Sequence, residues 1–140
     1  MEYNHPVLSV SAAFPADDGA IATAIAKAQE FASRAACGAD AEARLCIIIE
    51  ELVANIVEHG AAPAGSLIEL SIDAIGEDIG LTLDDGGTPF DPRLAEAPGD
   101  IPPERGGGAG IALVMAWSRA VEYRHDNGRN RLTLVIPAHG

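Results

Sequence analysis

The feature that most constrains the fold is a mostly apolar stretch, residues 47–60, that carries a narrow polar stripe. Apolar side chains recur at helical spacing through this stretch and just before it. They are Leu45, Ile48, Ile49, Leu52, Ile56 and Val57. Glu51, Asn55 and His59 follow at every fourth residue, so they lie along one side of that helix. Gly60 then acts as a stop signal. A solvated helix face would show the same stripe, so its meaning depends on the segments downstream.

Two downstream segments could carry chemistry. Asp85 lies just after a predicted strand and is followed by two glycines. Its carboxylate could accept a hydrogen bond from an exocyclic amine such as that of adenine, and the glycines let a flat ring approach the backbone. A glycine run at residues 106–110 opens a helix, and the free N–H groups of a helix N-terminus suit phosphate. The run is neither a Walker A loop nor a Rossmann fingerprint. Taken alone, the first segment is more typical of an acidic turn, and the second fits a flexible loop end.

The order of elements predicts one α/β two-layer sandwich over residues 1–140, with a mixed, mainly antiparallel sheet and the helices on one face. The predicted helices are Ala20–Ala36, Ala41–His59 and Gly108–Ser118. The predicted strands are Val7–Phe14, Leu67–Ile75, Ile79–Leu83, Val121–His125 and Arg131–Ile136. Asp40 is the expected N-cap of the second helix, Gly38 the expected end of the first, and Asn127-Gly128 a type I′ hairpin turn.

The charge balance limits the classes of ligand and partner that the chain could bind. The net charge is −12, from 9 basic and 21 acidic residues, which argues against direct binding to nucleic acid. Lys27 is the one lysine, so an anionic ligand would be held by backbone N–H groups, arginines or a metal. No apolar run is long enough to span a membrane and no basic-then-apolar signal opens the chain, so we expect a cytoplasmic protein. Cys37 and Cys46 lack metal-ligand spacing and are expected to be buried and reduced.

Three motifs occur in a specific order: Glu-x-x-x-Asn on a helix, Asp-x-Gly-x-Pro-Phe-Asp after a strand, and Gly-Gly-x-Gly-Ile-x-Leu-Val opening a helix. Together they resemble the GHKL ATP-binding (Bergerat) fold of gyrase-type topoisomerases, histidine kinases and anti-sigma-factor serine kinases. The lone domain and the closing Gly-Arg-Asn-Arg-Leu-Thr-Leu are most similar to the last group. The resemblance covers the chain from about Val7 to Ile136.

The resemblance implies a role for each matching residue. Asn55 would hold Mg²⁺, and Glu51 would be the general base that accepts the proton of a protein hydroxyl. Asp85 would bind the adenine amine. The other nucleotide-binding positions would be Gly87 beside the ring, Asn130 after the last hairpin turn, Arg105 in the loop, and Gly107, Gly108, Ala109 and Gly110 at the phosphates. Residues 88–107 lack periodicity and are expected to form an active-site lid.

The implied activity is transfer of the γ-phosphoryl group of MgATP to a Ser or Thr of a STAS-type anti-sigma factor antagonist, within partner switching. The resemblance also allows a sigma factor as a second partner and a homodimer as the assembly; the sequence decides neither. The alternative is a non-catalytic module that binds nucleotide and switches partners. Glu51 favours the kinase, because a pure binding module has no need of a base there. A module of a histidine-kinase pathway is disfavoured, because no dimerisation and phospho-acceptor helix pair is apparent.

Overall fold

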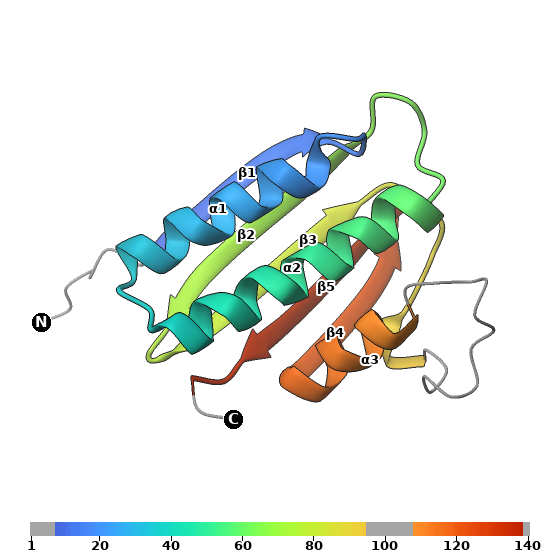
Figure 1. Ribbon diagram of the computed structural model, residues 1–140. Helices are drawn as coiled ribbons and strands as arrows, with labels where there is room; N and C mark the ends of the chain where they lie inside the picture. Colours follow the sequence, from blue (N-terminus) through green and yellow to red (C-terminus); the bar gives the residue numbers. More distant parts are fainter. Residues whose placement is uncertain (1–7, 95–107, 139–140) are drawn as a thin grey trace, which may run out of the picture.

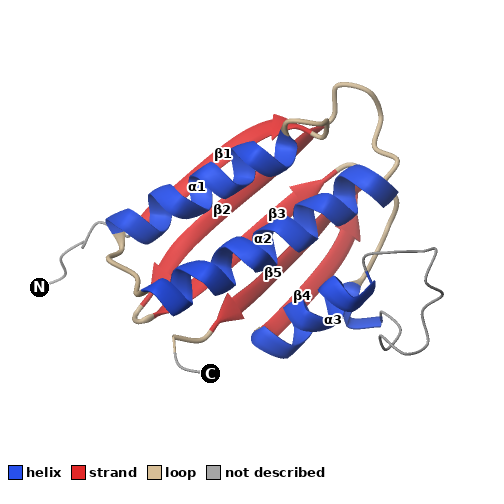
Figure 2. Ribbon diagram, viewed as in Figure 1, coloured by secondary structure: helices blue, strands red, loops and turns tan. Residues whose placement is uncertain are grey.

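The computed structural model describes residues 8–94 and 108–138, which form two layers (Figure 1). One layer is a five-stranded sheet, and the helices of these ranges lie on one of its faces (Figure 2). The strands are β1 (Ser9–Pro15), β2 (Leu67–Ile75), β3 (Asp78–Asp85), β4 (Arg119–Asp126) and β5 (Arg129–Ile136). The helices are α1 (Ala20–Arg34), α2 (Ala39–His59) and α3 (Gly108–Trp117), with a short 3-10 helix, η1 (Pro92–Leu94), after β3. The predicted two-layer architecture is confirmed.

The strands lie in the order β1-β2-β3-β5-β4, and each neighbouring pair is antiparallel. The prediction of a mainly antiparallel sheet is therefore confirmed for the described part of the chain. The register sets Ile72 opposite Leu81, and alternation along each strand then gathers the apolar residues on the face beneath the helices. Asn127 and Gly128, which join β4 to β5, have φ values of 53° and 76°, as the predicted type I′ turn requires.

Helix α2 crosses the middle of the sheet and supplies much of the core (Figure 1). Four of the six residues that the helical spacing selects are buried, together with Val53, while Ile56 and Val57 near the end of the helix are only partly buried. The buried set is Leu45, Ile48, Ile49, Leu52 and Val53. Helix α1 packs beside it, and its small residues Ala24 and Ala28 are fully buried in the same core. Helix α3 buries Ile111 and Val114, and its last residue, Trp117, is partly buried against the same core. No helix of the described ranges is both long and apolar enough to cross a membrane.

Two predicted helix boundaries are wrong. Helix α2 begins at Ala39, and Gly38, with extended backbone, takes the N-cap place that Asp40 was expected to fill. Asp40 instead lies in the first turn, where a carboxylate also favours the positive end of a helix. Helix α1 ends before Gly38, because Ala36 adopts a left-handed φ of 55°. The N–H of Cys37 then donates to the carbonyl of Ala32 across 2.9 Å, which closes a Schellman motif.

Candidate functional site

The polar stripe of α2 faces the start of α3. A Cβ atom placed on Gly110 would lie 1.9 Å from Oε2 of Glu51, so the carboxylate of Glu51 occupies the space that a side chain at residue 110 would take. Glu51 and Asn55 are both partly exposed, one helical turn apart. Within the described ranges neither side chain has a hydrogen-bond partner. His59, the third member of the stripe, is half exposed and lies 3.8 Å from Glu58.

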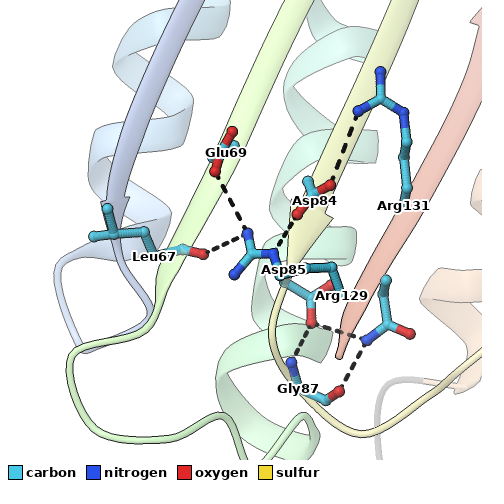
Figure 3. Close-up of polar contacts among 8 residues, drawn as sticks. Leu67, Glu69, Asp84, Asp85, Gly87, Arg129 and Arg131 are labelled. Carbon is cyan, nitrogen blue, oxygen red and sulfur yellow. Dashed lines mark hydrogen bonds and ion pairs between the residues drawn. The ribbon is translucent and has the colours of Figure 1, made fainter. Parts of the chain in front are cut away.

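Asp85 ends β3 with a buried carboxylate, 8% exposed. Its Oδ1 accepts a hydrogen bond of 2.8 Å from the backbone N–H of Gly87 (Figure 3). It accepts another of 3.1 Å from Nδ2 of Asn130. Burial of an acceptor is tolerated when it is hydrogen-bonded in this way. The carboxylate is therefore held in one orientation by two donors on Oδ1. Oδ2 makes no hydrogen bond to any residue of the described ranges.

The turn after β3 lies directly against the C-terminal end of α2. The N–H of Thr88 donates to the carbonyl of Gly60 across 2.5 Å. A Cβ atom on Gly87 would lie 2.6 Å from that same carbonyl oxygen, so only glycine lets the two backbones approach this closely. This contact brings the Asp85 turn to the helix that carries Glu51 and Asn55, although the two segments are far apart in the sequence.

Asn130 is the second buried polar residue of the described ranges, 5% exposed. The strand register places it opposite Asp85. Its Nδ2 lies 3.0 Å from the carbonyl oxygen of Gly87 and 3.2 Å from that of Thr88, besides its bond to Asp85. Its Oδ1 accepts a hydrogen bond from the hydroxyl of Tyr123 on β4. Asn130 therefore joins the turn after β3 to both strands at that edge of the sheet.

An ion-pair network secures the same strand ends on the opposite face of the sheet (Figure 3). Arg129 Nε donates to Asp84 Oδ1 across 2.5 Å, and its NH2 donates to the carbonyl of Leu67 across 3.1 Å. Glu69 lies 3.7 Å from Arg129, and Arg131 lies 3.9 Å from Asp84. The network ties β5 to both β3 and β2. It therefore holds the strand ends that carry Asp85 and Asn130 from the face of the sheet opposite those two side chains.

The start of the expected lid is organised by Asp91. Arg93 donates from Nε and NH2 to the two oxygens of Asp91, at 2.9 Å and 2.7 Å, and its backbone N–H donates to Oδ1 at 3.0 Å. The side-chain hydrogen bond from Arg93 lowers the pKa of Asp91 below its ordinary value. Arg93 therefore has its guanidinium committed to a neighbouring carboxylate, and the segment leads into η1.

Several of the predicted site residues lie close together in the structure, and others fall outside the residues that it describes. Glu51, Asn55 and Gly110 lie where α2 meets α3, and Asp85, Gly87 and Asn130 lie at the adjoining end of α2. Gly108 and Ala109 belong to the first turn of α3. Arg105, Gly107 and the lid beyond Leu94 lie outside the described residues. In the described part of the chain, no three His, Cys, Asp or Glu side chains form a metal-binding group.

Sequence reasoning missed Tyr123. Its phenol hydroxyl accepts a hydrogen bond of 3.1 Å from the backbone N–H of Phe90, in addition to its bond to Asn130. The sequence carries one weak signal, the alternation along β4 that puts Tyr123 on the same face as Val121, both of them partly buried. Nothing local connects it with the turn after β3.

A family model described as histidine kinase-like ATPase domain matches residues 14–136. A curated relative, the serine/threonine-protein kinase BtrW of Bordetella bronchiseptica, is 28% identical over 95 residues, which cover 65% of this chain and 67% of that protein.

Two solved structures have a similar fold. The structure of the RsbU and RsbW domains of Rv1364c from Mycobacterium tuberculosis matches with a TM-score of 0.68 and 20% identity. The match covers 94% of this chain and 32% of that one. The histidine kinase domain of the blue-light activated histidine kinase from Erythrobacter litoralis EL346 matches with a TM-score of 0.53 and 13% identity, over 89% of this chain and 62% of that one. This chain therefore spans about a third of the first structure and less than two thirds of the second.

Proposed function

Because the chain belongs to the histidine kinase-like ATPase domain family, we propose that it is an ATP-dependent serine/threonine-protein kinase of the anti-sigma-factor type. Its substrate would be a small STAS-type anti-sigma factor antagonist. The observation that carries the catalytic part is the Glu51 carboxylate, which lies against the first turn of α3 and has no hydrogen-bond partner in the described ranges. A carboxylate beside a helix N-terminus is well placed to serve as a base next to bound phosphate.

Adenine recognition is assigned to Asp85. Support comes from the two donors on Oδ1, which hold the carboxylate while Oδ2 keeps its capacity to accept the hydrogen bond of an exocyclic amine. Gly87 would lie beside the ring, because its backbone N–H is bonded to the Asp85 carboxylate and it has no side chain to keep a flat ring away from the backbone. Guanine presents a carbonyl where adenine presents the amine, so a fixed carboxylate would discriminate against GTP.

The phosphates are assigned to the start of α3, with Gly107, Gly108, Ala109 and Gly110 as the contacting positions and Arg105 as a cation from the lid. The donor set fits Mg²⁺, because that ion takes oxygen ligands and often needs one or two from protein. Asn55 offers an amide oxygen one turn from Glu51, with no described hydrogen-bond partner. When bound there, Mg²⁺ would supply positive charge that offsets the charge of the phosphates.

In the proposed reaction, the hydroxyl oxygen of a Ser or Thr on the partner forms a bond to the γ-phosphorus of ATP. The bond from that phosphorus to the β–γ bridging oxygen breaks, and ADP leaves with the electron pair. Glu51 accepts the hydroxyl proton. Asp85 at one end of the site and the first turn of α3 at the other would set the nucleotide in line for this transfer.

The relatives support the kinase class, and the antagonist as substrate rests on the resemblance of the three motifs to those of anti-sigma-factor kinases. BtrW is named a serine/threonine-protein kinase, and the similar Mycobacterium tuberculosis structure contains an RsbW domain. A sigma factor is proposed as a second, non-substrate partner, and a homodimer as an assembly compatible with the domain. The acidic chain, with a net charge of −12, supports protein partners over nucleic acid.

Single-turnover phosphorylation of a cognate antagonist tests the proposal. Glu51→Gln keeps the shape and removes the base, so transfer should slow by roughly 10²–10⁴-fold while ATP binding stays nearly intact. Asn55→Ala should instead weaken MgATP binding itself. Glu50→Gln is the matched control, since Glu50 is the exposed neighbour on α2 and should transfer at the wild-type rate. Equal rates for wild type and Glu51→Gln would remove Glu51 as the base. ATP binding without transfer to any cognate partner would favour a non-catalytic switching module.

A further inference from the structure

The hydroxyl of Tyr123 joins two parts of the chain that meet at the candidate site. It accepts a hydrogen bond of 3.1 Å from the backbone N–H of Phe90, five residues beyond Asp85. It also donates to Oδ1 of Asn130, on the neighbouring strand. One phenol therefore links β4, β5 and the segment that follows β3.

The direction of each hydrogen bond in this group follows from the atoms involved. Nδ2 of Asn130 lies within 3.2 Å of three acceptors, which are Oδ1 of Asp85 and the carbonyl oxygens of Gly87 and Thr88. The amide nitrogen must face them, so Oδ1 of Asn130 points to Tyr123. Because the N–H of Phe90 can only donate, the Tyr123 oxygen accepts from it and sends its own proton to Asn130.

We propose that Tyr123 is a positioning residue for recognition of the base: it fixes the Asn130 amide, which in turn fixes the carboxylate of Asp85. The inference rests on the proposed function, in which Asp85 receives the amine of adenine. Asn130 acts through Asp85, because each polar atom of its side chain already has a partner. A carboxylate that is held before the ligand arrives needs little rearrangement on binding.

Tyr123 lies on β4, at the edge of the sheet, and its hydroxyl supports a buried polar pair. Among the strands that the structure describes, β4 pairs only with β5, so the phenol reaches across β5 to the turn after β3 from the edge of the sheet. Asp85 and Asn130 are each less than a tenth exposed, and an isolated polar group at such depth is unfavourable without partners. Removal of the Tyr123 hydroxyl would leave Oδ1 of Asn130 without its donor, and the amide could then reorient away from Asp85.

Tyr123→Phe is the variant that tests this, because it removes one oxygen and keeps the ring. ATP and purine riboside triphosphate, which lacks the 6-amino group, are the two probes in calorimetric titrations. Binding of ATP should weaken roughly 3- to 10-fold in Tyr123→Phe, the effect of one lost hydrogen bond. Binding of purine riboside triphosphate should change by less than about 2-fold, since that ligand offers Asp85 no amine.

Ser9→Ala is the matched control. Ser9 also donates from a hydroxyl to a carboxylate, Asp73, across 2.6 Å, but on the face of the sheet away from the helices. Its loss should affect thermal stability and leave both nucleotide affinities unchanged.

The outcomes separate the inference from the function on which it rests. Equal weakening of both nucleotides by Tyr123→Phe would mean that the hydroxyl supports the fold in general, which overturns the inference. Wild-type ATP affinity in Tyr123→Phe would also overturn it, while the proposed function stands. A wild-type protein that binds no adenine nucleotide would overturn the proposed function and the inference together.

Discussion

Asp85 and Asn130 face one another across β3 and β5, with Nδ2 of Asn130 3.1 Å from Oδ1 of Asp85. Their chain neighbours form a second pair on the other face of the sheet, where Arg129 Nε lies 2.5 Å from Asp84 Oδ1. Successive residues of a strand point to opposite faces of the sheet. The Asp85–Asn130 pair therefore lies on one face, and the Asp84–Arg129 pair lies on the other. The strand ends at the candidate site are consequently held from both sides.

Asp85→Asn isolates the charge of that carboxylate. The amide oxygen can still accept from Gly87 and Asn130, so the turn should keep its shape. Affinity for ATP should fall by about 1–3 kcal/mol, the range for a disturbed buried hydrogen bond. Calorimetry measures this directly, with Asp73→Asn as a control carboxylate outside the site. Equal affinities of the wild-type protein for ATP and GTP would contradict the role assigned to Asp85.

Gly110→Ala should force the carboxylate of Glu51 to move, because the new methyl group would overlap it, at a cost of about 1 kcal/mol, the range for a side chain displaced from its rotamer. The paired variant Gly110→Ala/Glu51→Ala removes the overlapping atoms. Since alanine favours a helix over glycine by up to about 1 kcal/mol, the substitution at residue 110 should then be neutral or stabilising. Chemical denaturation of the four proteins in this cycle gives the coupling. Independent, additive effects would show that the two side-chain positions do not meet.

The Asp91–Arg93 pair predicts a local acid sensitivity. The folded pKa of Asp91 is lowered by the hydrogen bond from Arg93, so the pair stabilises η1 at pH above the unfolded value of about 4. This stabilisation should disappear as the pH falls further, through the folded pKa. An NMR titration of the Asp91 carboxyl carbon should show a midpoint below that of an unfolded peptide. In Arg93→Ala the midpoint should move upward, and an unmoved midpoint would contradict the assigned cause.

Ala36→Gly should stabilise the protein by up to about 1 kcal/mol. Ala36 has a φ of 55°, a conformation that glycine adopts without strain and alanine does not. Ala26→Gly is the matched control, for which the change in stability should have the opposite sign. Ala26 is also exposed but lies within α1. Glycine there should destabilise by about 1 kcal/mol. Thermal unfolding of both variants tests the pair; equal melting temperatures would contradict the strain argument.

Local periodicity predicted the elements well, because it is a property of a few neighbouring residues. The four-residue spacing of Glu51 and Asn55 put them on one helix face, and the alternation over Leu67–Ile75 gave β2 its bounds. The Asp40 cap failed for a local reason as well. Gly38 adopts the extended conformation of an N-cap two residues earlier, so the helix begins before the better capping side chain.

The contacts of the candidate site that could not be predicted depend on the register between neighbouring strands. Tyr123, Asn130 and Asp85 meet because three strands are aligned to the residue, and a shift of one position would turn each side chain to the other face. Propensity and spacing contain no information on that alignment. The contact between Gly60 and Thr88 has the same origin, since it requires the end of α2 to lie over the turn after β3.

Helix α3 ends at Trp117, the one tryptophan of the sequence, and its indole is partly buried against the core. Tryptophan emission from the unlabelled protein therefore reports the surroundings of this helix alone. The first turn of α3, the proposed phosphate site, lies roughly 15 Å away along the same helix. A displacement of α3 on nucleotide binding would thus appear as a change in emission, and rapid mixing could follow its rate.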